Sequence, residues 1–199
     1  WKDVDGILNA DPKVFPDAVQ IAELNYLDTI ELAYSGAQII HPKTIKPLQN
    51  KNIPLYVRPF GDKRKPGTVI RRMSAPIEVP ILILKKDQVL LTIRSRDFSF
   101  VLEEKFAAIF SLLERYRIKV NLVHNSAVNL SLCVDNSWHI DEAIQALRNE
   151  EFDVMKVENM ELLTIRGYNG DLMERYASGP EVFLLQRTQS TARIVRKNR

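Results

Sequence analysis

Residues 118–134 read Ile-Lys-Val-Asn-Leu-Val-His-Asn-Ser-Ala-Val-Asn-Leu-Ser-Leu-Cys-Val, and this stretch decides the fold of the second half of the chain. Apolar residues alternate with other residues at 118, 120 and 122, and again at 128, 130, 132 and 134. A period of two is typical of a β-strand with one buried face. Asn125 and Ser126 lie between the two runs and favour a turn. The stretch therefore predicts two antiparallel strands joined by a hairpin.

Helical patterns flank this predicted hairpin on both sides. Positions 102, 106, 109, 113 and 116 before it are apolar or aromatic at helical spacing, as are positions 140, 143, 144 and 147 after it. Residues 89–95 and 154–165 are strand candidates beyond the helices. The order βαββαβ predicts a ferredoxin-like arrangement, in which helices cover one face of an antiparallel sheet.

A short internal repeat indicates a second unit of the same kind. Leu-Leu-Thr-Ile-Arg-Ser at 90–95 returns as Leu-Leu-Thr-Ile-Arg-Gly at 162–167. A helix near 170–177 and strands near 182–186 and 192–196 continue this second copy, which lacks the last helix and strand.

The segment before the first unit has a different organisation. Residues 61–67 are polar, basic and turn-rich, and Pro76 and Pro80 follow, so an organisational break is expected between 61 and 80. The basic run favours an exposed loop over a phosphate contact. Upstream, Asn25 is expected to cap a helix that ends at Gly36, and Thr44 to cap a second one. Residues 53–58 and 68–72 are strand candidates.

Two strings in this first segment carry a family resemblance. Residues 1–13 read WKDVDGILNADPK, a cluster of carboxylates and turn formers that favours an irregular loop, and residues 32–45 read LAYSGAQIIHPKTI. Together they resemble the ATP-side half of aspartate kinase, an amino-acid-kinase family enzyme that phosphorylates the side chain of aspartate. The resemblance implies 4-phospho-L-aspartate as product, in lysine, threonine and methionine biosynthesis, and ATP with Mg²⁺ as cofactor of the full-length enzyme.

The resemblance also implies which residues contact ATP. Asp3 and Lys13 keep the chemistry of the family, although a turn-forming role for Asp3 and a solvated surface role for Lys13 are alternatives. Other matching positions differ from the family, so altered adenine and phosphate contacts are expected. The complete predicted set is Lys2, Asp3, Leu8, Lys13, Gln38 and Ile39.

No catalytic residue is predicted in this sequence. The family's Lys-Phe-Gly-Gly-Thr-Ser motif, its aspartate contacts and its catalytic acidic residue have no match here, and no glycine-rich phosphate loop occurs. Phosphoryl transfer requires groups around both substrates, so this chain alone is expected to be inactive.

Aspartate kinases carry two ACT domains, which are small ferredoxin-like modules that bind amino-acid effectors, and residues 89–199 resemble them. One ACT unit of the family is inserted into the other, so residues 77–85 are expected to supply the strand that the second copy lacks. The predicted organisation is a kinase portion at 1–72, a linker and strand at 73–88, a first ACT domain at 89–157 and a second, truncated one at 158–199. The fold class is α/β followed by α+β.

The resemblance places an effector site at Asn121, Asn125, Ser126 and Ala127. Lysine-inhibited members have an Asp at the first position and a Ser-Glu pair at the last two, so two carboxylates are lost here. Weak or no lysine binding is expected. Simple turn and strand-edge roles are the alternative for Asn121, Asn125 and Ser126.

The composition disfavours some classes of function. The chain has 199 residues, 45% hydrophobic and 27% charged, with a net charge of +3 that is too small to indicate nucleic-acid binding. An RNA-binding ferredoxin-like domain is disfavoured because residues 128–134 contain no aromatic residue for base stacking. The single cysteine, Cys133, is interpreted as a buried, inert thiol in a reducing compartment.

Further expectations concern location and partners. No apolar run is long enough to span a bilayer and no signal sequence opens the chain, so a cytoplasmic location and no membrane partner are expected. No metal is expected at His124 or His139. A homodimer through the ACT domains is expected, because their sheets pair edge to edge and cover exposed strands. A stand-alone amino-acid sensor without catalytic activity is the alternative function.

Overall fold

The computed structural model describes residues 1–37, 40–73, 79–97 and 103–198. The chain divides into two compact units, each built from several segments. Unit 1 contains Trp1–Leu84, Leu163–Ala177 and Arg187–Arg193, and unit 2 contains Lys85–Leu162, Ser178–Gln186 and Ile194–Arg199. The boundaries predicted from the sequence at 72, 88 and 157 stay predictions.

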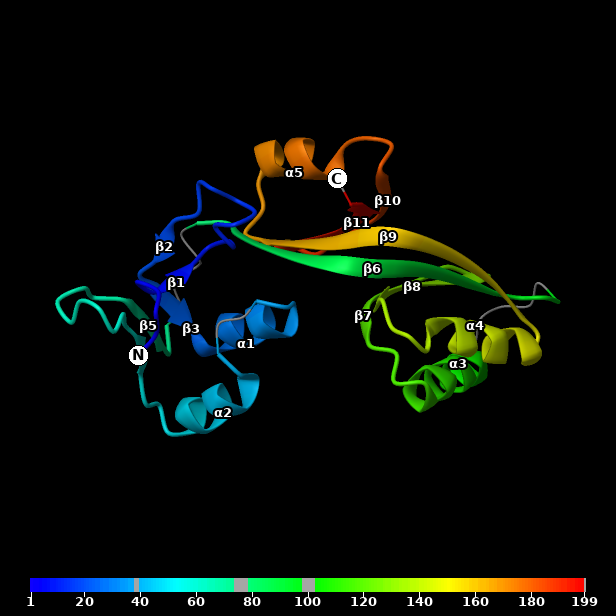
Figure 1. The fold of residues 1–199 in the computed structure, drawn as a ribbon, viewed down its shortest axis with the longest axis horizontal. Coiled ribbons are helices and arrows are strands. Elements are labelled where there is room, and N and C mark those ends of the chain that lie inside the picture. Colours follow the sequence, from blue (N-terminus) through cyan, green and yellow to red (C-terminus); the bar gives the residue numbers. More distant parts are fainter. Residues whose placement is uncertain (38–39, 74–78, 98–102, 199) are drawn as a thin grey trace. The chain divides into compact units, whose positions relative to one another are not determined.

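A small mixed sheet with two helices forms the first part of unit 1 (Figure 1). Strand β5 (Thr68–Arg71) lies between β3 (Glu23–Asn25), which is parallel to it, and β4 (Leu55–Val57), which is antiparallel. Strands β1 (Ile7–Leu8) and β2 (Gln20–Ile21) form an antiparallel pair. Apolar side chains from these strands and from helices α1 (Tyr26–Tyr34) and α2 (Pro42–Asn50) share one core.

The two helices test the predicted caps. Asn25 caps α1 as predicted, with its side chain accepting a 2.6 Å hydrogen bond from the Asp28 backbone N–H. The cap predicted at Thr44 is wrong, because α2 begins at Pro42. The Nδ1 atom of His41 accepts from the Lys43 backbone N–H at 3.2 Å, and proline suits the first helical position, where no backbone N–H is needed.

The later strands of the chain form a six-stranded sheet, in the order β10-β11-β9-β6-β8-β7. Its bounds are β6 (Ile81–Ser95), β7 (Val120–Asn125), β8 (Asn129–Asp135), β9 (Phe152–Arg166), β10 (Val182–Arg187) and β11 (Thr191–Lys197). Strands β6 and β9 have 15 residues each, so both are longer than the strands predicted from the sequence at 89–95 and 154–165. Residues 81–85, expected to serve the second ACT unit, are the first part of β6; residues 77–78 lie outside the described ranges.

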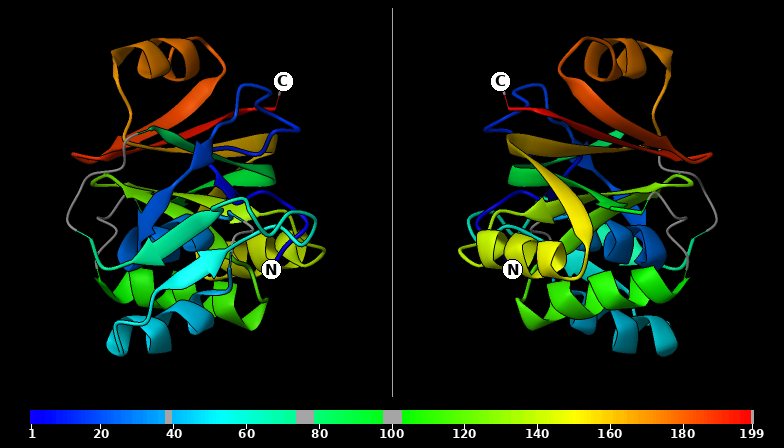
Figure 2. Two further views of the ribbon diagram at one scale, coloured as in Figure 1. Left: turned by 90° about the vertical axis from the view of Figure 1, so that its left-hand side faces the viewer. Right: turned by 90° about the vertical axis from the view of Figure 1, so that its right-hand side faces the viewer.

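Two helices cover one face of the sheet in unit 2. Helix α3 (Glu103–Arg115) and helix α4 (Ile140–Asn149) lie on the same side of the strands (Figure 2). Their apolar stripes pack against β6 and β8, around Leu91, Ile109 and Leu132. This is the predicted βαββαβ arrangement. Helix α5 (Gly170–Ala177) belongs to unit 1.

The opposite face of the sheet in unit 2 encloses a second apolar cluster. Members of this cluster come from β6, β7, β8, β9, β10 and β11. Gln186 on β10 donates a 3.3 Å side-chain hydrogen bond to the carbonyl of Val123 on β7, although these are the two edge strands. The sheet therefore curls until its edges meet through a side chain.

A buried ion pair connects two neighbouring strands of unit 2. Arg196 on β11 lies 2.7 Å from the carboxylate of Glu161 on β9, and the two side chains are 7% and 4% exposed. Ion pairs at this depth need their partners, because an isolated buried charge is costly.

Candidate functional site

The loop predicted to face ATP is irregular apart from the short strand β1, as expected, and buried hydrogen bonds hold it in place. The Thr68 hydroxyl is fully buried; it accepts from the Ile7 backbone N–H at 2.8 Å and donates to the Ile21 carbonyl at 2.6 Å. A Cβ on Gly6 would lie 2.6 Å from Gln20 Nε2 and 2.7 Å from Thr68 Oγ1. Glycine at position 6 therefore lets the loop close onto β5.

Asn9 and Asp11 stabilise the next part of the loop. The Asn9 side chain accepts from the Val19 N–H at 2.8 Å and donates to the Pro80 carbonyl at 2.9 Å. Asp11 Oδ1 accepts from the Lys13 N–H at 2.9 Å. These polar side chains, which belong to the turn-forming cluster at 1–13, fix the backbone of the loop through hydrogen bonds.

Four of the six predicted ATP-binding residues lie in the described part of the chain. Lys2 is fixed by its backbone, which donates to the Arg58 carbonyl at 2.8 Å and accepts from the Phe60 N–H at 2.9 Å. Asp3 follows it with an exposed side chain, and Leu8 is half-buried on β1. Lys13 is exposed in the turn. Gln38 and Ile39 lie outside the described residues.

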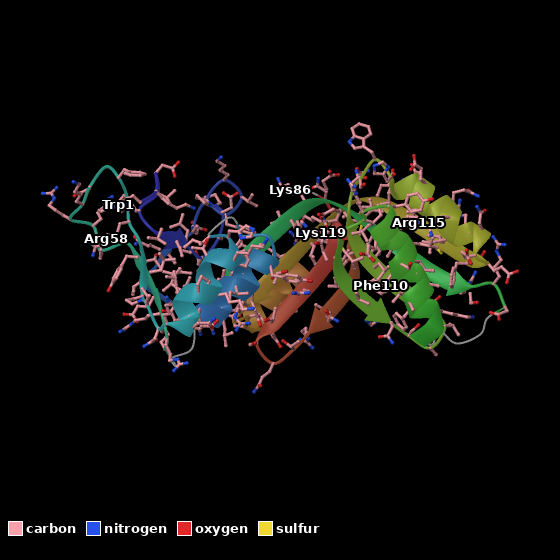
Figure 3. All side chains as sticks on the ribbon, turned by 90° about the horizontal axis from the view of Figure 1, so that it is seen from below. Trp1, Arg58, Lys86, Phe110, Arg115 and Lys119 are labelled. Carbon is pink, nitrogen blue, oxygen red and sulfur yellow. The ribbon has the colours of Figure 1, made fainter. Side chains whose placement is uncertain are left out.

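A hollow of about 380 Å³ lies beside Lys2, lined by Trp1, Tyr56 and Arg58. Trp1 stacks on Phe60 with ring centroids 6.3 Å apart, and the Arg58 guanidinium lies 5.6 Å from the Tyr56 ring centre. The Nε atom of Arg58 is buried and has no hydrogen-bond partner in the described part of the chain. Exposed aromatic faces beside a guanidinium suit a flat ring that carries an anionic group. Arg58, labelled next to Trp1 in Figure 3, carries no sequence motif that would mark it as a ligand contact.

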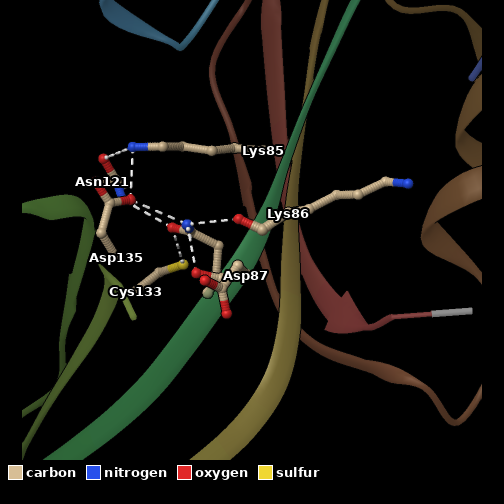
Figure 4. Close-up of polar contacts among 7 residues, drawn as sticks. Lys85, Lys86, Asp87, Asn121, Cys133 and Asp135 are labelled. Atoms are coloured by element: carbon tan, nitrogen blue, oxygen red, sulfur yellow. Dashed lines mark hydrogen bonds and ion pairs between the residues drawn. The ribbon is translucent and has the colours of Figure 1, made fainter. Parts of the chain in front are cut away.

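Around the predicted effector position Asn121, the structure shows a dense polar network (Figure 4). The Asp135 carboxylate lies 2.6 Å from Lys85 Nζ and accepts from Gln88 at 3.0 Å and from Asn121 at 2.7 Å. Asn121 also accepts from Lys85 at 2.9 Å and donates to the Gln88 side chain at 2.7 Å. The side chain of Asn121 is thus engaged within the chain.

The charges in this network are balanced internally. Burial raises the pKa of Asp135, but the hydrogen bonds from Lys85, Gln88 and Asn121, with the Lys85 charge, outweigh burial and hold the pKa below its ordinary value. The Lys85 ammonium therefore neutralises the Asp135 carboxylate within the chain. Sequence reasoning missed Lys85, because its partners lie far away in the chain.

Cys133 lies next to this network and is fully buried. Its Sγ is 3.6 Å from Gln88 Oε1, and burial, followed by the Asp135 charge, raises the pKa of the thiol to about 12. A thiol that stays protonated is a poor nucleophile. The predicted burial of Cys133 is confirmed, and its lack of reactivity stays a prediction.

The other predicted effector residues lie at the far end of β7. Asn125, Ser126 and Ala127 are exposed in the hairpin turn, where Ser126 N–H donates to the Asn129 carbonyl at 2.8 Å. Asn125 lies four residue steps along the strand from Asn121, or about 13 Å. One copy of the chain does not bring Asn121 and this turn together around one small ligand.

The described ranges contain no cluster of three or more His, Cys, Asp or Glu side chains able to hold a metal ion. Within them, no helix is long and apolar enough to cross a membrane.

Comparisons with known proteins give matches to both the first segment and the ferredoxin-like region. The amino acid kinase family model matches residues 1–59. Lysine-sensitive aspartokinase 3 of Escherichia coli is 31% identical over 191 residues, which is 92% of this chain and 42% of that protein. The match therefore runs through both the kinase segment and the ferredoxin-like region. The chain belongs to the aspartokinase family.

Other aspartokinases agree in sequence and fold. Chloroplastic aspartokinase 3 of Arabidopsis thaliana is 37% identical over 144 residues, covering 69% of this chain and 25% of that protein. The solved structure of E. coli aspartokinase III with aspartate and ADP superposes with a TM-score of 0.80 at 25% identity, over 99% of this chain and 48% of that one. This chain spans less than half the length of these aspartokinases and corresponds to their carboxy-terminal part.

Proposed function

We propose that this chain is the ATP-side and regulatory portion of an enzyme that transfers the terminal phosphoryl group of ATP to the side-chain carboxylate of L-aspartate. The observation that carries this proposal is the continuous match to an aspartokinase over 191 residues, from the kinase segment through the regulatory region. An amino-acid sensor unrelated to a kinase would not require the first segment to match the amino acid kinase family.

The nucleotide is proposed to bind along Lys2, Asp3 and Leu8, next to the aromatic hollow. Leu8 stands where the family has a tyrosine, and Trp1 and Tyr56 supply aromatic faces close by. Lys13 and Arg58 bring positive charge for phosphate oxygens. The family's Mg²⁺ would be held mainly by the phosphates of ATP, since Mg²⁺ commonly binds through substrate phosphates and one or two carboxylates.

Residues of this chain would supply only part of the reaction site. Phosphoryl transfer depends on positioning and charge stabilisation around both substrates. The aspartate contacts and the catalytic acidic residue of the family have no counterpart in this sequence. Turnover is therefore proposed for the complete enzyme in its reducing, cytoplasmic setting, and not for this chain alone.

The regulatory region is proposed to form a homodimer and to respond weakly, if at all, to lysine. One of the relatives is named as lysine-sensitive. Here Asn121 and Ala127 replace two carboxylates of lysine-inhibited members, and Lys85 neutralises the carboxylate of Asp135 at 2.6 Å. A free lysine would therefore find no uncompensated negative charge beside Asn121.

The test is an assay of the complete enzyme with ATP, Mg²⁺ and L-aspartate, in which hydroxylamine traps the acyl phosphate. Aspartate-dependent hydroxamate is expected, and L-glutamate should give little. Asp3→Asn should raise the KM for ATP roughly tenfold, the effect of losing one charge-assisted contact of about 1.4 kcal/mol. Asp17→Asn, an exposed carboxylate of the same segment, is the matched control. Absence of aspartate-dependent product would contradict the proposal.

A further inference from the structure

Asn169 and Gly170 form the only asparagine–glycine pair in the sequence. In such a pair the backbone nitrogen of the glycine can attack the side-chain carbonyl carbon of the asparagine, because glycine has no Cβ to obstruct the approach. Both residues are exposed, where the loop after β9 leads into α5. Solvent therefore reaches the Asn169 amide.

The Asn169 side chain caps α5. Its Oδ1 atom accepts from the Leu172 backbone N–H at 2.9 Å, and its backbone carbonyl accepts from the Met173 N–H at 3.1 Å. This is the arrangement of a helix N-cap, in which a side-chain oxygen satisfies one of the first N–H groups of the helix. The cap holds the amide on Leu172, so attack by the Gly170 nitrogen requires this hydrogen bond to break.

Helix α5 is held weakly in its first turn. It has eight residues, and none of them is buried. The aromatic ring of Tyr176 contacts Phe15 edge-on, with centroids 6.2 Å apart, but Tyr176 lies in the last turn. A helix this short is marginal on its own, so the cap supplies a large share of the stability of the first turn.

The loop before α5 is fixed more firmly than the helix. The Gly167 N–H donates to the Ser190 carbonyl at 2.7 Å, and the Tyr168 hydroxyl donates to the Thr188 carbonyl at 2.8 Å. Local opening is therefore expected on the helical side of Asn169, where it frees the amide from Leu172.

The sequence contains one comparable pair, Asp5-Gly6, and its surroundings are closed. An aspartate–glycine pair forms the same ring by losing water instead of ammonia. Gly6 is buried, however, and the Asp5 carboxylate lies 2.6 Å from Lys65 Nζ. Asp5-Gly6 thus serves as an internal reference with the same glycine and without the freedom to rotate.

We propose that Asn169 is a site of spontaneous deamidation, and that opening of the α5 cap sets its rate. The Gly170 nitrogen forms a bond to Cγ of Asn169 while the Cγ–Nδ2 bond breaks, and the proton of the attacking nitrogen leaves with the amide nitrogen as ammonia. The five-membered succinimide then adds one water molecule. Ring opening at one carbonyl gives aspartate, and opening at the other gives isoaspartate, in which the main chain runs through the former side chain.

The two products should affect α5 in opposite ways. Aspartate keeps an acceptor at the cap and adds a negative charge at the amino terminus of the helix, where a negative charge is favourable. Isoaspartate lengthens the main chain and displaces the acceptor from the Leu172 N–H. The first turn of α5 should then fray, and the amides that follow Gly170 should exchange faster with deuterium.

Incubation of the folded 199-residue chain at pH 8, followed by peptide mapping with mass spectrometry, tests the proposal. The peptide that contains Asn169 should gain the mass of an amide-to-acid conversion, and the Asp5-Gly6 peptide should stay free of isoaspartate. Gly170→Ala is the matched control: its Cβ meets nothing within 4 Å, so the fold is retained, and conversion should slow roughly tenfold because the Cβ obstructs the attack.

A second variant tests the role of the cap. Leu172→Pro removes the N–H that holds the Asn169 oxygen, at a position in the first helical turn where proline is tolerated. Conversion should accelerate about tenfold, as expected when a cap is lost. Circular dichroism before incubation shows whether the rest of the chain is folded, and the unmodified chain in urea gives the rate without any cap.

The outcomes decide each part of the inference. An Asn169 peptide that stays unmodified while exposed Asn125, which is followed by serine, converts would overturn the assignment of the site. Equal rates for the folded unmodified chain, Leu172→Pro and the chain in urea would overturn the control by the cap. Neither result changes what is expected of aspartate phosphorylation by the complete enzyme.

Discussion

Replacing Thr68 by valine should destabilise unit 1 strongly, although the side-chain shape is nearly conserved. The buried hydroxyl satisfies the Ile7 N–H and the Ile21 carbonyl at 2.8 and 2.6 Å. Valine leaves both groups without this partner, and a buried polar group left unpaired costs about 1–3 kcal/mol. The two together predict a loss of about 2–6 kcal/mol, a large fraction of the stability of a typical domain.

Thr68→Ser is the matched control for this prediction. Serine keeps the hydroxyl and removes one methyl group, which costs about 0.8 kcal/mol. Native-state hydrogen exchange of the Ile7 amide reports the local effect, and urea unfolding followed by circular dichroism reports the effect on the chain. Equal losses for valine and serine, or a loss below about 1 kcal/mol for valine, would refute the reasoning.

Three further predictions concern unit 2. The Cys133 thiol should resist iodoacetamide at pH 8 in the folded chain and react once urea unfolds it, because burial raises its pKa to about 12; rapid alkylation of the folded chain would contradict this. Lys85→Met should move the midpoint of acid unfolding to higher pH. Because the pKa of Asp135 is depressed in the folded chain, Asp135 stabilises the fold above the ordinary aspartate pKa of 3.8, and this stability is lost as the pH falls through the depressed pKa. Lys85→Met removes a hydrogen bond that lowers the pKa, so the stability should be lost at a higher pH. An unchanged midpoint would count against the network. Glu161→Gln should cost about 3–5 kcal/mol in urea unfolding by leaving Arg196 without its carboxylate, and adding Arg196→Met should recover part of this loss; additive losses would argue against the pair.

The elements that the sequence predicted well are those set by local interactions. The α1 cap needs only Asn25 and the backbone three residues later. The hairpin of β7 and β8 and the stripes of α3 and α4 follow from short-range periodicity. By contrast, Thr44 was predicted to cap the second helix, whereas α2 begins at Pro42 with His41 as its cap.

The full lengths of β6 and β9 depended on contacts that a local pattern does not contain. Lys85, Lys86 and Asp87 interrupt the apolar pattern of β6, yet the strand continues because Asp135 and Asn121 compensate Lys85. Asp87 has a positive φ of 54°, and Asn159 in β9 has one of 58°. Asp and Asn tolerate this conformation better than most residues, so each strand passes through its irregular centre.

The sequence predicted which segments form the candidate site, but it did not predict which side chains contact one another there. The strings at 1–13 and 32–45 predicted a nucleotide-facing segment, but the hollow beside Trp1 also needs Tyr56 and Arg58, more than fifty residues away. Likewise, Asn121 was singled out for an effector, and only the fold revealed that Lys85 lies within hydrogen-bonding distance of it.

Hydrogen–deuterium exchange of the complete enzyme, with and without ATP and Mg²⁺, shows whether the first segment binds the nucleotide. Exchange is expected to slow over residues 1–13 and over 55–60, which contain the hollow and the predicted ATP contacts, with no direct protection of the 120–135 hairpin. Protection confined to the hairpin, or no protection anywhere in these residues at saturating ATP, would contradict the assignment of the first segment as the nucleotide side of an aspartokinase.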